Sequence, residues 1–277
     1  MVSTHKPSGL PAWPVILLAG GEKCGKSYAC VEFSASQMID RTFYIEVGEM
    51  KAEEYGAFPG ARFELVDHDG SYPSMLAEAQ SILEVPRGKD DKPHCIVVDS
   101  IGKLWELLGD EQASIMKQRK KSTITVDQWN VAKRKWKDFF NVLAQHNGPV
   151  ILTARYELVA LMDERGMPTG GKDWKIKAEK NLGFDVDATI TCATPRDWVL
   201  TTIASLRYDL PPGGKKLPGF TIERFLGTLG LDQAGPRRYV PTKEDISDEP
   251  AGRVTFDQLE GAKDQGLQGV QTADAST

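Results

Sequence analysis

The segment Gly20 to Ser27 (GGEKCGKS) has a residue pattern that binds phosphate groups. It fits G-x-x-x-x-G-K-[ST] at every required position and lies between an apolar strand-like run and a helix-like run, the context that this motif requires. The glycines let backbone N–H groups point at phosphate oxygens, and the N-terminus of the following helix favours anions. Lys26 is expected to reach the β- and γ-phosphates of a nucleotide, and the Ser27 hydroxyl to hold Mg²⁺. The pattern therefore predicts ATP and Mg²⁺ as cofactors, and the nucleotide-binding residues it predicts are Gly20, Gly21, Glu22, Lys23, Cys24, Gly25, Lys26, Ser27 and Tyr28.

A carboxylate ends a second apolar run, some 70 residues after this loop, in the segment HCIVVDS. Asp99 has the position of the metal-holding acid of nucleotide hydrolases and is expected to accept a hydrogen bond from a Mg²⁺-bound water. An alternative is that Asp99 caps a helix beginning at Ile101, although Ser100 is equally suited to that role. A buried charge without a partner costs free energy, so a carboxylate at the end of so apolar a strand favours the metal role.

The strand-like run Thr42–Val47 has two further acids near its end, in the segment YIEVGEM: Glu46 within the run and Glu49 after it. Hydrolysis of a nucleotide needs a base that orients water in line with the γ-phosphate. Glu49 lies just past the strand and is our predicted catalytic base. Glu46 remains a second candidate that could instead pair with a lysine, and Glu49 could also be a solvated loop acid.

The run PVILTAR ends in polar residues. Thr153 and Arg155 are predicted to sense the γ-phosphate at the end of this strand and to pass its presence to the next loop. The alternative for Arg155 is an ordinary surface cation.

Composition and charge set the broad class of the protein. The chain has 277 residues, of which 40% are hydrophobic, enough for a sizeable core, and no apolar run approaches the roughly 20 residues of a membrane-spanning helix. The four cysteines show neither zinc-site nor disulfide spacing, so we expect a soluble protein of a reducing compartment, the cytoplasm, without membrane partners. Of the net charge of −5, residues 232–277 carry −4, and these residues are predicted to be a flexible acidic tail after a core of residues 1–231.

Strand-like and helix-like runs alternate along that core, which predicts an α/β fold with a mostly parallel central sheet and helices on both faces. The expected strands are Val15–Ala19, Thr42–Val47, Phe63–Val66, His94–Asp99, Pro149–Thr153, Ala188–Ala193 and Trp198–Ala204. The expected helices are Ser27–Ile39, Tyr72–Leu83, Ile101–Leu108 and Val126–His146. The stretch Glu157–Asp185 is weakly periodic and is expected to be a loop or a hairpin.

The phosphate loop, the acid-bearing strand, the strand ending in polar residues and the Lys- and Gly-bearing stretch after it resemble the RecA/RadA recombinase ATPase core. More narrowly, the chain resembles the short RecA-like ATPases of bacteriophages that act in recombination or single-strand annealing. The resemblance covers about residues 10–230, and it implies a RecA-like P-loop NTPase in which Lys26, Glu49 and Asp99 are catalytic. It also implies a ring or filament of identical subunits, single-stranded DNA and a single-strand-binding protein as partners, and the host cytoplasm as location if the chain is phage-encoded. The chain departs from RecA in having Thr-Ala-Arg where RecA has a glutamine-bearing segment.

Two basic stretches are candidates for contacts with nucleic acid. Between Ala113 and Lys137 there are eight Lys or Arg residues and one acid, and the stretch Glu157–Asp185 is also Lys-rich. In the recombinase arrangement the corresponding loops face the DNA, so their cations would contact phosphates. The residues proposed for this role are Lys117, Arg119, Lys120, Lys121, Lys172, Lys175, Lys177 and Lys180. A solvated helix face is the alternative, and Lys175, Lys177 and Lys180 could instead reach a neighbouring subunit's γ-phosphate.

Three other functions use the same loop. A DnaB-like helicase-type motor ATPase shares the core, and a small-molecule P-loop kinase or a non-enzymatic ATP-gated scaffold would share the loop alone. The kinase would need an Arg-rich lid, whereas residues 157–185 hold only Arg165. ATP turnover with and without single-stranded DNA would separate these functions.

Overall fold

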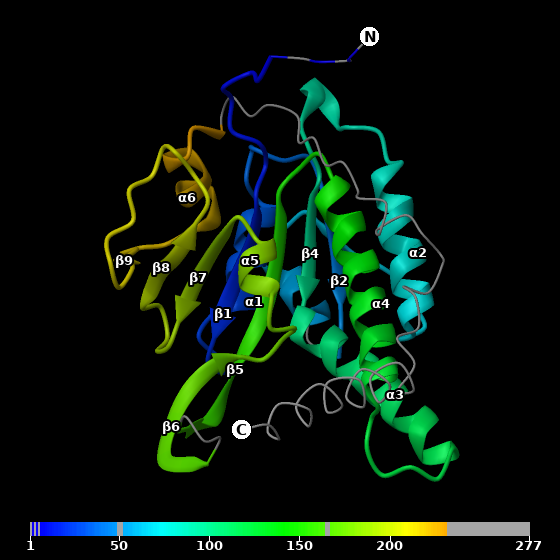
Figure 1. Ribbon diagram of the computed structural model, residues 1–277. Coiled ribbons are helices and arrows are strands. Elements are labelled where there is room, and N and C mark those ends of the chain that lie inside the picture. Colours follow the sequence, from blue (N-terminus) through cyan, green and yellow to red (C-terminus); the bar gives the residue numbers. More distant parts are fainter. Residues whose placement is uncertain (1, 3, 5, 49–51, 164–166, 232–277) are drawn as a thin grey trace, which may run out of the picture. The chain divides into compact units, whose positions relative to one another are not determined.

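The computed structural model describes residues 2, 4, 6–48, 52–163 and 167–231, which form an α/β core (Figure 1). Its strands are β1 (Val15–Gly20), β2 (Thr42–Glu46), β3 (Phe63–Leu65), β4 (Cys95–Asp99), β5 (Val150–Met162), β6 (Pro168–Ile176), β7 (Ala188–Cys192), β8 (Trp198–Ile203) and β9 (Lys215–Lys216). Its helices are α1 (Lys26–Ser34), α2 (Tyr72–Leu83), α3 (Ile101–Gln118), α4 (Val126–Gln145), α5 (Leu182–Asp185) and α6 (Ile222–Thr228), with short 3₁₀ helices η1 (Glu53–Ala57) and η2 (Lys89–Asp91).

The strands form one sheet in the order β3-β2-β4-β5-β1-β7-β8-β9, with β6 paired to β5. The pairs β2–β3, β2–β4, β4–β5, β1–β5 and β1–β7 are parallel, and the pairs made by β6, β8 and β9 are antiparallel. This confirms the mostly parallel sheet. Because parallel strands end at the same edge, β1, β2, β4 and β7 present their last residues together, where α/β folds bind ligands.

Helices cover both faces of the sheet, as predicted. In β1, Val15 and Leu17 pack on the side of α2, α3 and α4, whereas Ile16 and Leu18 pack on the side of α1 and α6. Such continuous apolar strands are typical of a sheet that is buried on both faces. The chain therefore has the predicted α/β class of fold, with a mostly parallel central sheet between two layers of helices.

Three predicted extents were wrong. The helix predicted as Ile101–Leu108 continues to Gln118, so Lys117 lies on α3 and not in a loop. The strand predicted to end at Thr153 continues to Met162 and pairs with β6. Of the two structures expected for the stretch Glu157–Asp185, a loop or a hairpin, the protein thus has the hairpin. The helix predicted as Ser27–Ile39 ends at Ser34. The short elements β9 and α6 were not predicted.

The four cysteines, Cys24, Cys30, Cys95 and Cys192, are buried, and none of them forms a disulfide. Residues 232–277, predicted as a tail, lie outside the described residues, as does Glu49. Within the described part of the chain, no helix combines the length and the apolar character needed to cross a bilayer.

A buried histidine at the edge where the strands begin makes stability depend on pH. His146 is 7% exposed, and its Nε2 lies 2.9 Å from the carbonyl oxygen of His94. Burial lowers the pKa of His146 from 6.5 to about 4, so the folded state resists a proton that the unfolded chain accepts. We expect the contribution of His146 to the free energy of unfolding to be fully present above pH 6.5. It should fall by about 3 kcal/mol as the pH is lowered to 4.

Urea unfolding of the wild type and His146→Gln between pH 7.5 and 4.5 measures this effect. The difference in unfolding free energy between the two proteins should shrink as the pH falls, because the glutamine does not titrate. A difference that stays constant over this range would contradict the assignment.

Candidate nucleotide-binding site

The phosphate loop depends on glycine at two positions. A Cβ on Gly20, the last residue of β1, would lie 2.1 Å from the backbone oxygen of Cys192, and the neighbouring Gly21 N–H donates to that same oxygen at 3.1 Å. Gly25 precedes α1 with a φ of +103°, a conformation that side chains disfavour. The two glycines thus fix the loop against β7 and turn it into the helix.

Lys26 lies across the loop. Its ammonium donates to the carbonyl oxygens of Gly21 at 2.7 Å and of Gly20 at 3.2 Å. The first turn of α1 has no acidic residue, and Gly25 provides no side-chain cap. The helix N-terminus and the ammonium therefore place positive charge together at the loop, which suits the phosphates of ATP. Glu22, Lys23 and Tyr28 are exposed around it, and Cys24 is buried.

Asp99 lies at the centre of a cluster of hydroxyl groups. Its carboxylate is 5% exposed and accepts hydrogen bonds from Ser27 Oγ at 2.6 Å, from Tyr44 OH at 2.5 Å and from Thr153 Oγ1. Ser100, not Asp99, caps α3, since its Oγ accepts from the backbone N–H of Lys103 at 3.3 Å. The structure thus brings together the phosphate-loop serine and the predicted metal-holding acid, and it removes the capping alternative.

The donors beside the loop fit a magnesium ion. Mg²⁺ prefers oxygen ligands and is usually bound by one or two protein groups, several waters and substrate phosphates. Ser27 and Asp99 supply a hydroxyl and a carboxylate 2.6 Å apart, next to the loop that would hold the phosphates. Among the described residues there is no cluster of three His, Cys, Asp or Glu side chains that could hold a metal ion on its own. The chemistry of this donor pair fits a site in which Ser27 and Asp99 would hold Mg²⁺ together with water and nucleotide oxygens.

Tyr44 is the member of this cluster that sequence reasoning missed. It lies on β2, is 1% exposed and donates to Asp99. Burial, followed by the charge of Asp99, raises its pKa well above the ordinary value, so the phenol keeps its proton. A tyrosine inside an otherwise apolar strand needs a polar partner for its hydroxyl, and that need was the available signal.

Glu46 lies beside Asp99 but is engaged locally. The two residues are opposite each other in the parallel β2–β4 pair, and Glu46 Oε1 accepts from the Ala52 N–H at 3.0 Å. Glu46 thus organises the chain that follows β2. Glu49, the predicted catalytic base, lies outside the described residues.

Thr153 and Arg155 lie within β5 and not at its end. Thr153 is fully buried and bonds to Asp99, whereas Arg155 pairs in register with Gly20 of the phosphate loop. The Arg155 carbonyl accepts from the Lys177 N–H at 2.8 Å, where β5 leaves the sheet for the hairpin. One strand thus connects the Asp99 cluster with the β5–β6 hairpin.

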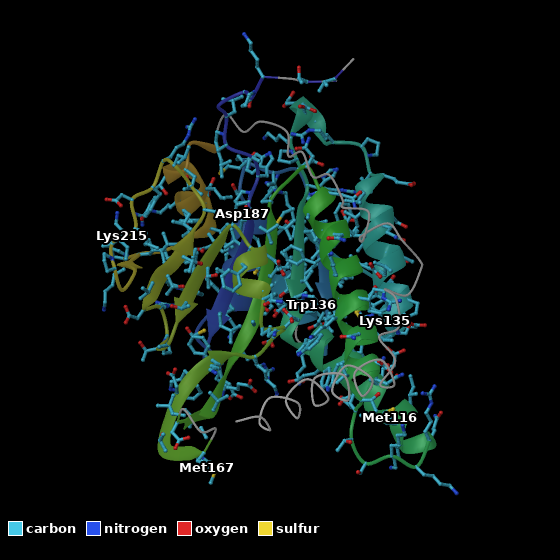
Figure 2. The ribbon with its side chains drawn as sticks, viewed as in Figure 1. Met116, Lys135, Trp136, Met167, Asp187 and Lys215 are labelled. Atoms are coloured by element: carbon cyan, nitrogen blue, oxygen red, sulfur yellow. The ribbon has the colours of Figure 1, made fainter. Side chains whose placement is uncertain are left out.

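The basic residues lie on two separate segments, the end of α3 with the turn after it and the β5–β6 hairpin with the residues after it. Met116 on α3 and Met167 on the hairpin mark these two places in Figure 2. Lys117, Arg119, Lys120 and Lys121 are exposed at the end of α3 and in the turn after it, and Lys175 and Lys180 are exposed on or after β6. Lys172 belongs to β6, with its side chain outside the description.

Lys177 differs from the other lysines because it is paired. Its ammonium contacts Glu106 of α3, which also pairs with Lys103 at 2.6 Å. The hydrogen bond to Glu106 raises the pKa of Lys177. This pair ties the base of the hairpin to α3, so Lys177 is less available to phosphate than its neighbours.

Solved structures of two proteins resemble this fold. The crystal structure of the RadB recombinase is 18% identical, with a TM-score of 0.38, covering 68% of this chain and 80% of that one. The crystal structure of the flagellar accessory protein FlaH from Methanocaldococcus jannaschii is 15% identical, with a TM-score of 0.33, covering 69% and 77%. No curated protein matches this chain significantly in sequence.

A protein-family model matches the part of the chain that contains this site. The match spans residues 13–197, from just before β1 to the turn after β7, and the family is described as an AAA domain. It includes the phosphate loop, the Asp99 cluster and the hairpin. The chain therefore belongs to this AAA domain family of P-loop ATPases.

Proposed function

We propose that this protein is a Mg²⁺-dependent, RecA-like ATPase that acts on single-stranded DNA in recombination, annealing or repair. The observation that carries the proposal is the course of β5, which contacts Asp99 through Thr153 and then continues into a hairpin that exposes Trp174 and Lys175. A strand with this course can transmit the state of the nucleotide to the DNA-binding segment. Subunits assembled as a ring or filament would line up such hairpins along one strand.

In ATP hydrolysis at the phosphate loop, each of the surrounding side chains would have a distinct role. Lys26 would neutralise charge on the β- and γ-phosphates, and the loop N–H groups would hold them in place. Bound Mg²⁺, held by Ser27 and through water by Asp99, would supply charge stabilisation at the same oxygens. Tyr44 and Thr153 would orient the Asp99 carboxylate by donating hydrogen bonds to it. Glu49 remains our proposed base for the attacking water.

The β5–β6 hairpin exposes side chains that are suited to binding single-stranded DNA. Trp174 is 60% exposed, pairs across the hairpin with the exposed Leu158, and lies with its ring 6.3 Å from that of Tyr156. Lys175 follows it on the opposite face and is also exposed. Exposed aromatic rings stack with bases of any sequence, and neighbouring cations contact the phosphates. This combination favours binding to single strands with little sequence preference.

Replacing Lys120 and Lys121 by alanine tests the DNA contacts. Each lost phosphate contact lowers the slope of log affinity against log salt by about 0.7 for a single strand, so the double variant should lose about 1 to 1.5. Fluorescence anisotropy with an oligothymidine between 50 and 300 mM NaCl measures the slope. The DNA-free ATPase rate should stay unchanged, because neither residue belongs to the nucleotide site.

The matched control is Lys215→Ala with Lys216→Ala, two exposed lysines on β9. This pair should leave the salt slope at its wild-type value. Equal slopes for the wild type and the Lys120/Lys121 variant would show that these two lysines do not contact the DNA phosphates. A wild type without measurable affinity for single strands would favour a DNA-independent kinase or scaffold.

A further inference from the structure

An aromatic pair lies beside the phosphate loop and takes no part in the phosphate and Mg²⁺ contacts described above. Tyr28 directly follows Ser27 and is 47% exposed, although the next residues of α1, Ala29 and Cys30, are buried. Its ring meets that of Phe58 edge to face, with centroids 5.4 Å apart and planes at 81°. Phe58 follows η1 and is half-buried. The pair therefore keeps one large ring open to solvent at the start of the phosphate-binding helix.

The position of Tyr28 suits the part of a nucleotide that extends beyond the phosphates. Lys26, which would contact the β- and γ-phosphates, and Tyr28 are two residues apart, or about 3 Å along the helix axis. A nucleotide whose phosphates occupy the loop has its ribose and base attached next to this first turn. The Tyr28 ring is thus within reach of those groups.

Phe58 gives the Tyr28 ring a fixed orientation. The backbone N–H of Phe58 donates to Tyr55 at 2.9 Å, and its carbonyl accepts from Ala61 at 3.1 Å, so the residue is held in a turn. Edge-to-face contact between aromatic rings is favourable and restricts the rotation of each ring. An oriented ring loses less conformational entropy when a flat ligand stacks on it.

We propose that Tyr28, supported by Phe58, is the platform on which the nucleobase of the bound nucleotide stacks. This inference rests on the proposed nucleotide-binding function and adds the base specificity of that site. Stacking uses the flat face of the base and does not read its hydrogen-bonding edge. The site should therefore prefer purines to pyrimidines, because purines have the larger stacking surface, and should discriminate little between ATP and GTP.

Calorimetric titration of the full-length protein with Mg²⁺ and four ligands tests this platform. The ligands are ATP, GTP, CTP and inorganic tripolyphosphate, the last of which has the phosphates without a base. For the wild type we expect similar affinities for ATP and GTP and weaker binding of CTP and tripolyphosphate. Tyr28→Ala should weaken ATP and GTP binding by about tenfold and leave tripolyphosphate binding unchanged.

Two further variants make the test specific. Tyr28→Phe keeps the ring and should retain the affinity for ATP, whereas Phe184→Ala removes a 91% exposed aromatic ring from α5 and should change nothing. Unchanged ATP affinity in Tyr28→Ala would overturn the platform, and so would an equal loss for ATP and tripolyphosphate, which would indicate damage to the loop. A wild type that binds neither ATP nor tripolyphosphate would refute the nucleotide-binding function itself, and the platform with it.

Discussion

Lys26→Ala is expected to lower the rate of ATP hydrolysis by about a hundredfold or more while leaving the fold intact. The ammonium is the positive side chain that lies across the loop, held by the carbonyl oxygens of Gly20 and Gly21. Its charge would act on the phosphoryl group as that group acquires negative charge, and alanine provides none. Alanine also favours the helix, so α1 should form normally. Phosphate release at saturating ATP and Mg²⁺ measures the rate, and circular dichroism checks the fold.

Lys89→Ala is the matched control for the loss of one positive charge. Lys89 is exposed on η2, before β4 begins and thus at the opposite edge of the sheet from the loop. Its removal should leave the hydrolysis rate within experimental error of the wild type. A folded Lys26→Ala protein with near-normal turnover would refute the phosphate-loop assignment.

The second large effect is expected from Asp99→Asn. The change keeps the shape of the side chain but removes the charge that would attract Mg²⁺, and it places an NH₂ donor where hydroxyl groups now donate. We expect hydrolysis to fall by about a hundredfold or more, because metal-ion stabilisation of the phosphates is lost. Binding of ATP without Mg²⁺ should persist, since the loop and Lys26 are unchanged. Titrations with ATP in EDTA and in Mg²⁺ separate the two effects.

Tyr44→Phe distinguishes the metal role of Asp99 from a merely structural one. It removes one of the hydrogen bonds to the carboxylate but keeps its charge, at a buried position where the ring still fills the core. Hydrolysis should then fall by less than in Asp99→Asn, and Mg²⁺ should still strengthen ATP binding. If Mg²⁺ strengthens ATP binding equally in Asp99→Asn and the wild type, Asp99 does not support the metal.

Local motifs made the phosphate loop and Asp99 predictable. The loop is encoded in eight consecutive residues, and Asp99 is a charge at the end of an apolar run, so neither depends on distant contacts. Tyr44 was missed because its role depends on two strands lying side by side. The pairing of Lys177 with Glu106 likewise joins residues 71 positions apart in sequence, one just after β6 and the other on α3. Such contacts arise from the fold and have no local pattern.

The wrong element boundaries have local causes. The predicted helix Ile101–Leu108 stopped just before Gly109, where a Cβ would lie in ordinary contact with the Trp129 ring, at 3.7 Å. This glycine lies where α3 packs against α4, within a helix that continues to Gln118. The strand β6 (PTGGKDWKI) has too many glycines and charges to resemble a strand alone, and it is stabilised by pairing with β5.

The rate of ATP hydrolysis by the full-length wild type, measured with and without single-stranded DNA, tests the central claim most directly. Because β5 connects the Asp99 cluster to the hairpin, DNA bound at the hairpin is expected to change the geometry at Thr153 and Asp99. We predict Mg²⁺-dependent hydrolysis that increases severalfold when oligothymidine is added, an increase that disappears at high salt where DNA binding is lost. Hydrolysis that is insensitive to DNA at low salt, or no hydrolysis under any of these conditions, would contradict the account.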